Sequence, residues 1–209
     1  MKKLALALLL AANAAWADPG RDFLRAVSLD DVGTLTKLLA AHQVDPNLAD
    51  PQRGENGLIL ALRDDAMRSF HLLLEQPGIR IDQPAANGNT ALMMAAFKGN
   101  KQAVLDLIAH GAAINKPGWT PLHYAAAAGE VDIATLLLER KADLNAPSPT
   151  GITPLMLAAR EGKDEAVKLL LARGADTRLV NNEKLTAEQI ARRADKPRIA
   201  ALIAAAMAK

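Results

Sequence analysis

Four histidines are the candidates for acid–base chemistry, because histidine is the side chain whose ordinary pKa lies near neutrality. They are His42, His71, His110 and His123, and no two of them stand at the spacing of a metal-ligand pair. His123 lies in the stretch INKPGWTPLHYAAAAGE, residues 114–130, which also holds Trp119 and Tyr124. This stretch is therefore a candidate for a catalytic loop, a structural unit or a binding surface.

The other residue patterns give no support for an enzyme. The chain has no cysteine, which excludes thiol catalysis, disulfides and cysteine-based metal sites. It has neither a glycine-rich phosphate loop after a strand nor a Gly-x-Ser-x-Gly elbow. Adjacent carboxylates at 30–31 and 64–65 fall at junctions between predicted helices, where we expect them to cap the next helix. We predict no catalytic residue, no cofactor and no metal.

The segment 1–17 has the composition of a bacterial export signal. Lys2 and Lys3 are followed by an almost entirely apolar run from Leu4 to Ala15, and Ala15-Trp16-Ala17 supplies small residues for cleavage. The run is much shorter than the roughly 20 residues that span a bilayer. We predict a signal peptide over 1–17, cleavage after Ala17, a periplasmic mature chain and no membrane insertion after cleavage.

Charge argues against a nucleic-acid partner. Without Lys2 and Lys3, the chain has 23 basic and 23 acidic residues. Nucleic acids reward proteins with clustered positive charge. The best anion-binding candidate is the basic run Arg192, Arg193, Lys196 and Arg198, which a solvated helix face explains equally well.

A repeat with a nearly constant period runs through the chain. Thr90, Thr120, Thr153 and Thr186 are almost evenly spaced, and each begins a short helical pattern. A second pattern with aliphatic residues at i, i+3, i+4 and i+7 follows each one, which predicts a buried helical stripe. The threonines are suited to cap the first helices, and the segments between units are rich in Asn, Asp, Pro and Gly, as turns are. The pattern predicts an all-α chain.

Two segments carry a resemblance to a known family. GWTPLHYAAAAGEVDIATLLLERKADLNA (118–146) and GITPLMLAAREGKDEAVKLLLARGADTRL (151–179) resemble ankyrin repeats. The resemblance implies an all-α solenoid of stacked helix-turn-helix units with short β-hairpin-like fingers. We expect about five repeats over 18–209 and a C-terminal capping helix pair. For His123 the resemblance implies a structural hydrogen bond between neighbouring repeats.

Two departures from the repeat pattern are informative. The glycine expected after the second helix is present as Gly111 and Gly174, but Lys141 takes its place in the unit between them. A left-handed backbone there costs a lysine roughly 1 kcal/mol. The link before Trp119 is three residues shorter than its downstream counterpart, so we expect a truncated finger.

The resemblance also implies which side chains face a partner. Large aromatic side chains supply binding hot spots, and alanines beside them leave room for a partner. This favours a pocket between Phe97 and the Trp119–Tyr124 pair, although such bulky residues also pack between repeats. The predicted protein-binding residues are Leu60, Arg63, Met94, Phe97, Lys98, Trp119, Tyr124, Ala127, Ala128, Leu157, Arg160 and Glu161; Asp64 belongs to the same face.

These expectations define three functional hypotheses. The first is a monomeric interaction module that binds a periplasmic protein through its concave face, as scaffold or stabilising subunit of an envelope enzyme, including one of stress defence. The second is an immunity protein that neutralises a toxin delivered to the periplasm. The third, from another class, is a small-ligand carrier or an enzyme that uses the Phe97–Tyr124 pocket.

Overall fold

The computed structural model describes residues 18–208, and the predicted signal peptide lies outside them. The described residues form helices joined by turns, and they divide into two compact units between Arg80 and Ile81. Among these residues no strand is present, only an isolated antiparallel bridge between Ala49 and Asn56. The all-α class is therefore confirmed, while a single domain over 18–209 stays a prediction.

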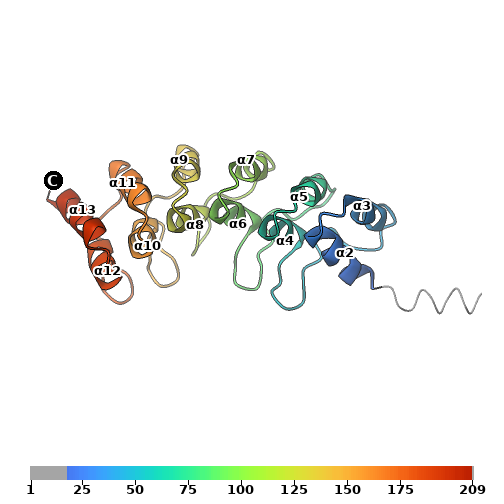
Figure 1. Cartoon of the computed structure of the whole chain (residues 1–209), viewed down its shortest axis with the longest axis horizontal. Coiled ribbons are helices and arrows are strands. Elements are labelled where there is room, and N and C mark those ends of the chain that lie inside the picture. Colours follow the sequence, from blue (N-terminus) through green and yellow to red (C-terminus); the bar gives the residue numbers. More distant parts are fainter. Residues whose placement is uncertain (1–17, 209) are drawn as a thin grey trace, which may run out of the picture. The chain divides into compact units, whose positions relative to one another are not determined.

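The first unit contains two helix pairs. Helix α2 packs against α4, and α3 packs against α5 (Figure 1). Asp18 caps α2 by accepting hydrogen bonds from the amides of Gly20 and Arg21. Phe23 and Phe70 are fully buried and supply the largest side chains of the core. The helices are α2 (Pro19–Ser28), α3 (Val32–Ala40), α4 (Gly57–Arg63) and α5 (Met67–Leu74).

The second unit contains four helix pairs. Its first helices pack in the order α6, α8, α10 and α12, and its second helices in the order α7, α9, α11 and α13 (Figure 1). The helices are α6 (Ala91–Phe97), α7 (Lys101–Ala109), α8 (Pro121–Ala128), α9 (Val131–Glu139), α10 (Pro154–Glu161), α11 (Asp164–Ala172), α12 (Ala187–Arg193) and α13 (Pro197–Met207). None of the described helices is long and apolar enough to cross a membrane.

The helix boundaries follow the predicted capping residues. Thr90, Thr120, Thr153 and Thr186 are the residues that precede α6, α8, α10 and α12. Gly162 ends α10 in the left-handed conformation, which glycine adopts without a steric cost. The prediction for the carboxylate pairs holds at Asp31, which caps α3, but not at 64–65, because Ala66 is the N-cap of α5.

Alanine pairs allow the first helices of the second unit to approach closely. Ala95 and Ala96 on α6 are fully buried, and α8 and α10 carry equivalent pairs at 125–126 and 158–159. A small side chain at such a contact brings two helix axes nearer than a leucine allows. The close approach adds to the burial of the larger side chains on the same helices, such as Leu92, Leu122 and Leu155.

Both departures from the repeat pattern are visible in the backbone. Lys141 adopts the left-handed conformation with φ of 64°, where Gly111 and Gly174 have φ of 89° and 85°. In three fingers of the second unit a turn is closed by a backbone hydrogen bond, as from the Ser148 amide to the Ile152 carbonyl at 2.8 Å. Residues 113–119 make no backbone hydrogen bond of this kind, which agrees with a truncated finger.

Candidate functional site

The second unit has a surface pocket where the sequence predicts one. Its volume is about 360 Å³. It is built from the C-terminal end of α6, the truncated finger and the outward faces of α8 and α10. The lining residues are Phe97, Trp119, Tyr124, Ala127, Leu157, Arg160 and Glu161.

The Tyr124 ring contacts the two other aromatic rings of this pocket edge to face. The ring centroids of Phe97 and Tyr124 are 6.3 Å apart at 87°, and those of Trp119 and Tyr124 are 6.4 Å apart at 66°. These are favoured geometries for aromatic pairs. Phe97 is nonetheless 51% exposed, so much of its ring remains available for contact. We call Phe97, Trp119 and Tyr124 the aromatic cluster.

Tyr124 fixes the position of the cluster. Its hydroxyl donates a hydrogen bond of 2.5 Å to Oδ1 of Asn89, a residue of the preceding finger. Burial raises the pKa of the Tyr124 hydroxyl, and the bond to Asn89 offsets only part of this effect. The phenol thus stays protonated and serves as a rigid anchor for its ring.

His123 is structural. It is fully buried, and its Nδ1 accepts a hydrogen bond of 3.2 Å from the Thr120 amide. Because Nδ1 is an acceptor, Nε2 carries the proton and donates to the Ile152 carbonyl at 2.9 Å. Burial lowers the pKa of the imidazole. The predicted hydrogen bond between neighbouring repeats is confirmed.

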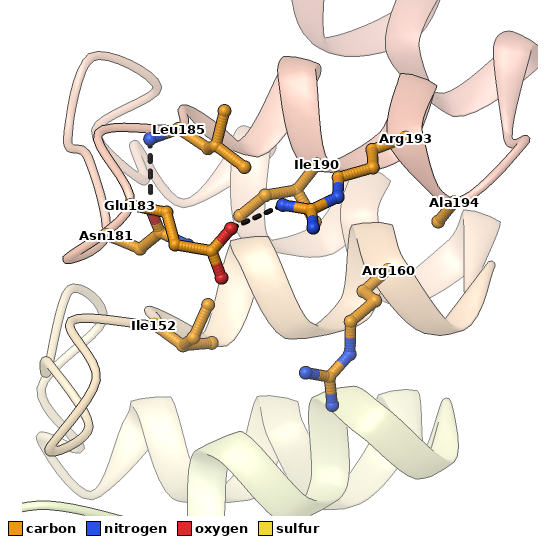
Figure 2. A pocket seen from close by; sticks show the side chains of 8 residues that line it. All are labelled: Ile152, Arg160, Asn181, Glu183, Leu185, Ile190, Arg193 and Ala194. Atoms are coloured by element: carbon orange, nitrogen blue, oxygen red, sulfur yellow. Dashed lines mark hydrogen bonds and ion pairs between the residues drawn. The ribbon is translucent and has the colours of Figure 1, made fainter.

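Arg160 connects the aromatic pocket to a second pocket of about 280 Å³ beside α12 (Figure 2). Arg160 lines both pockets, and its Nε donates to Oε1 of Glu161 at 3.0 Å. Figure 2 shows the Glu183 carboxylate turned toward the Arg193 guanidinium, with which it forms an ion pair. The apolar part of the second pocket comes from Ile152, Leu185, Ile190 and Ala194.

The predicted residues Leu60 and Arg63 belong to the first unit and line a groove there. Leu60 is almost fully buried, whereas Arg63 forms ion pairs with Glu55 and with Asp64, the latter at 3.0 Å. The hydrogen bond to Asp64 chiefly raises the pKa of Arg63, which keeps the guanidinium charged. Arg63 is therefore a fixed part of the groove wall.

The remaining predicted residues lie beside the aromatic pocket and do not line it. Met94 and Ala128 are half-buried on α6 and α8, and Lys98 is exposed at the end of α6. The structure thus brings seven of the twelve predicted residues into one pocket. Their role in binding stays a prediction.

The basic run at the C-terminal end is internally paired. Arg192 pairs with Glu188, Arg193 with Glu183, and Arg198 with Asp164 at 3.2 Å. Each of these arginines therefore pairs with a different carboxylate. This pairing favours the interpretation of the basic run as a solvated helix face over its interpretation as an anion-binding site.

The second pocket is not among the predicted sites, although the repeat contains a signal for it. Ile152 and Leu185 stand directly before Thr153 and Thr186, as Trp119 stands before Thr120. The position before the capping threonine therefore contributes a pocket side chain in each of these three repeats. The ion pair of Glu183 with Arg193 joins a finger to the far end of the helix that follows it, which no local pattern predicts.

The two pockets of the second unit offer apolar surface beside paired polar groups. Their lining combines aromatic and aliphatic side chains with paired charges, and the Tyr124 hydroxyl is already hydrogen-bonded. Within residues 18–208 no three His, Cys, Asp or Glu side chains gather as metal ligands do. The arrangement can bury apolar side chains of a partner and hydrogen-bond its polar groups.

Comparison with known proteins agrees with the repeat architecture. A model of three ankyrin repeats matches residues 23–117 and 68–148, and a single ankyrin-repeat model matches residues 150–182.

Several known proteins are similar to parts of the chain. Palmitoyltransferase AKR1 of Lachancea kluyveri is 32% identical over 111 residues, which is 50% of this chain and 15% of that protein. Human SH3 and multiple ankyrin repeat domains protein 2 is 34% identical over 124 residues, covering 57% and 7%. Mouse protein phosphatase 1 regulatory subunit 27 is 37% identical over 76 residues, covering 35% and 49%.

The chain spans less than half the length of each of these relatives. They are eukaryotic proteins, so they give no support for the predicted bacterial origin and export. The family models cover most of residues 23–182, the same part of the chain in which the structure shows stacked helix pairs. On this evidence the chain belongs to the ankyrin-repeat family.

Proposed function

We propose that this protein is a non-enzymatic interaction module that binds another protein through the aromatic pocket. Ankyrin repeats generally mediate protein–protein interaction. The observation that carries the proposal is the aromatic cluster, held rigid by Tyr124 and open on the side of Phe97 and Ala127. Aromatic side chains in a preformed, partly apolar pocket provide the anchoring contacts of protein interfaces.

The proposed location is the bacterial periplasm. Asp18, which would be the first residue after the predicted cleavage, is the N-cap of α2, so cleavage after Ala17 would leave the first helix intact. N-terminal sequencing of protein recovered from periplasm should begin at Asp18. Protein that retains residues 1–17, or that stays in the cytoplasm, would contradict the proposed export.

The proposed partner is an envelope enzyme that this chain, as a monomer, scaffolds or stabilises. The experiment is affinity purification of the mature chain from periplasm, beside a Trp119→Ala/Tyr124→Ala variant and a Val180→Ala control. Val180 is exposed and lies outside both pockets. The expected result is one enzyme that is captured by the wild type and the control, escapes the double variant and falls in abundance when the gene is deleted.

Two other results would support a different function. A captured toxin, bound with about nanomolar affinity or tighter, would show an immunity protein. A small molecule that remains bound to the purified protein in native mass spectrometry would show a carrier, since the pocket volume is near the lower end of small-ligand sites, about 300 Å³. Capture that is identical for the wild type and the double variant would overturn the assignment of the aromatic pocket.

A further inference from the structure

The first unit contains a groove whose basic character no sequence pattern indicated. Its volume is about 630 Å³. One face of α2, the finger before α4 and the outward side of α4 form it. The lining residues are Arg21, Leu24, Arg25, Ser28, Leu29, Asp50, Gln52, Arg53, Leu60 and Arg63. We call this the arginine groove.

The groove concentrates positive charge in a unit that is acidic as a whole. Residues 18–80 include seven basic side chains and ten acidic ones, and four of the seven basic ones line the groove. Arg21 and Arg25 are one helical turn apart on α2, so their side chains extend from the same face. The concentration therefore comes from the fold and not from composition.

Two carboxylates at the groove, those of Asp50 and Glu55, already have partners. The Asp50 carboxylate accepts three backbone hydrogen bonds, from the amides of Gln52, Arg53 and Glu55. Burial by itself raises the pKa of Asp50, but these bonds together outweigh burial and lower it. Glu55 is buried and pairs with Arg63. Neither of these two carboxylates forms an ion pair with Arg21, Arg25 or Arg53.

Arg21, Arg25 and Arg53 form no ion pair with any residue that the structure describes. A guanidinium has five N–H donors in a planar arrangement that matches a carboxylate bidentately. Leu24 and Leu29 also line the groove beside these arginines, and Leu29 is 65% exposed. The groove thus presents carboxylate-binding groups together with apolar surface.

We infer that the arginine groove receives an acidic segment of the partner protein, one with at least two carboxylates and an apolar side chain. This inference rests on the proposed function, because it names the chemistry of part of the partner. Single-stranded nucleic acid is disfavoured, since the groove has no aromatic side chain on which bases stack. An anionic membrane is disfavoured because the unit as a whole is acidic.

The test uses a random twelve-residue peptide library displayed on phage and the mature chain as bait. The second bait is Arg21→Gln/Arg25→Gln/Arg53→Gln. The matched control is Lys37→Gln/Arg68→Gln/Arg80→Gln, which removes the same charge from the other three basic residues of the unit. All three baits are first checked for equal helix content and melting temperature.

The expected peptides are rich in Asp and Glu, contain a leucine-like residue and bind the wild type. As synthetic peptides they should bind the groove variant at least about tenfold more weakly and the control within about twofold. Raised salt, or replacement of their carboxylates by amides, should weaken binding in the same way. The Trp119→Ala/Tyr124→Ala variant should bind these peptides as the wild type does. The test of the arginine groove is therefore independent of the test of the aromatic pocket.

Two outcomes would overturn the inference. One is a failure of the peptide selection to show acidic, arginine-dependent binding. This failure could be a selected set without an excess of Asp and Glu, peptides that bind the wild type and the groove variant equally, or no peptide specific for the wild type. The other is arginine-dependent binding of single-stranded DNA, or of vesicles of phosphatidylcholine and phosphatidylglycerol, in place of acidic peptides. That result would assign the groove to another class of macromolecule.

Discussion

At the scale of single residues, the side chain that first suggests catalysis is one of the most constrained in the molecule. His123 is buried, accepts the Thr120 amide at Nδ1 and donates from Nε2 to the Ile152 carbonyl. A protonated imidazole cannot accept at Nδ1, so protonation would break the hydrogen bond from Thr120. The neutral form is therefore the one that joins the two repeats.

This predicts a dependence of stability on pH. The folded chain holds the pKa of His123 below its ordinary value, whereas the unfolded chain does not. Stability is complete above the unfolded pKa of about 6.5 and falls as the pH drops below it, by up to about 1.4 kcal/mol per pH unit. In urea titrations between pH 7.5 and 5, the wild type should lose more free energy of unfolding than His123→Gln. Equal losses in the two proteins would contradict the role of His123.

Lys141 gives a second prediction at this scale. Its left-handed backbone is unfavourable for a residue with a Cβ atom, so Lys141→Gly should raise the free energy of unfolding by about 1 kcal/mol. Gly174 occupies the equivalent position, and a Cβ atom there would meet no other atom within 4 Å. Gly174→Lys should therefore lower stability by a similar amount for backbone reasons alone. Chemical denaturation measures both, and a loss at Lys141→Gly would refute the explanation.

At the scale of helices and fingers, the caps determine where the units begin. At α12 the Gln189 amide donates to the Thr186 hydroxyl at 3.3 Å, and the Gln189 side chain accepts from the Thr186 amide at 2.9 Å. Because α12 has only seven residues, a lost cap affects much of its length. It also carries Ile190 and Arg193 to the second pocket.

We expect Thr186→Ala to destabilise α12 by about 1 kcal/mol. Hydrogen exchange should become faster for the amides of its first turn, because the terminal helix pair can open locally. Thr186→Ser keeps the hydroxyl and serves as the control. Unchanged protection in the alanine variant would show that packing alone holds the beginning of α12.

The helices and caps could be predicted from the sequence because they are local. Four almost evenly spaced threonines, each followed by two helical patterns, were sufficient to place the first helices of the second unit. The aromatic pocket could also be predicted from the sequence, since equivalent positions in neighbouring repeats stack. The arginine groove could not be predicted in this way, because it joins Arg21 and Arg25 on α2 to a finger beyond α3, which is not adjacent to them in the sequence.

At the scale of the whole molecule, the two compact units present surfaces of different chemistry. The first carries the arginine groove, and the second carries the aromatic cluster, whose neighbouring charges are paired. Repeat folds permit this, since each single repeat is stabilised mainly by the repeats beside it, and its outward side chains are free to differ. The proposed function requires a partner protein with an apolar anchor for the aromatic pocket, and the role inferred for the arginine groove adds that this partner has an acidic segment.

The central claim is that the aromatic pocket binds this partner. The most direct measurement is isothermal titration of the purified partner with the wild type, Trp119→Ala, Tyr124→Ala and the Val180→Ala control. Each aromatic truncation should weaken binding by about 2 kcal/mol or more, while the control stays at the wild-type affinity. Wild-type affinity in both aromatic variants, with their folds intact, would contradict the claim.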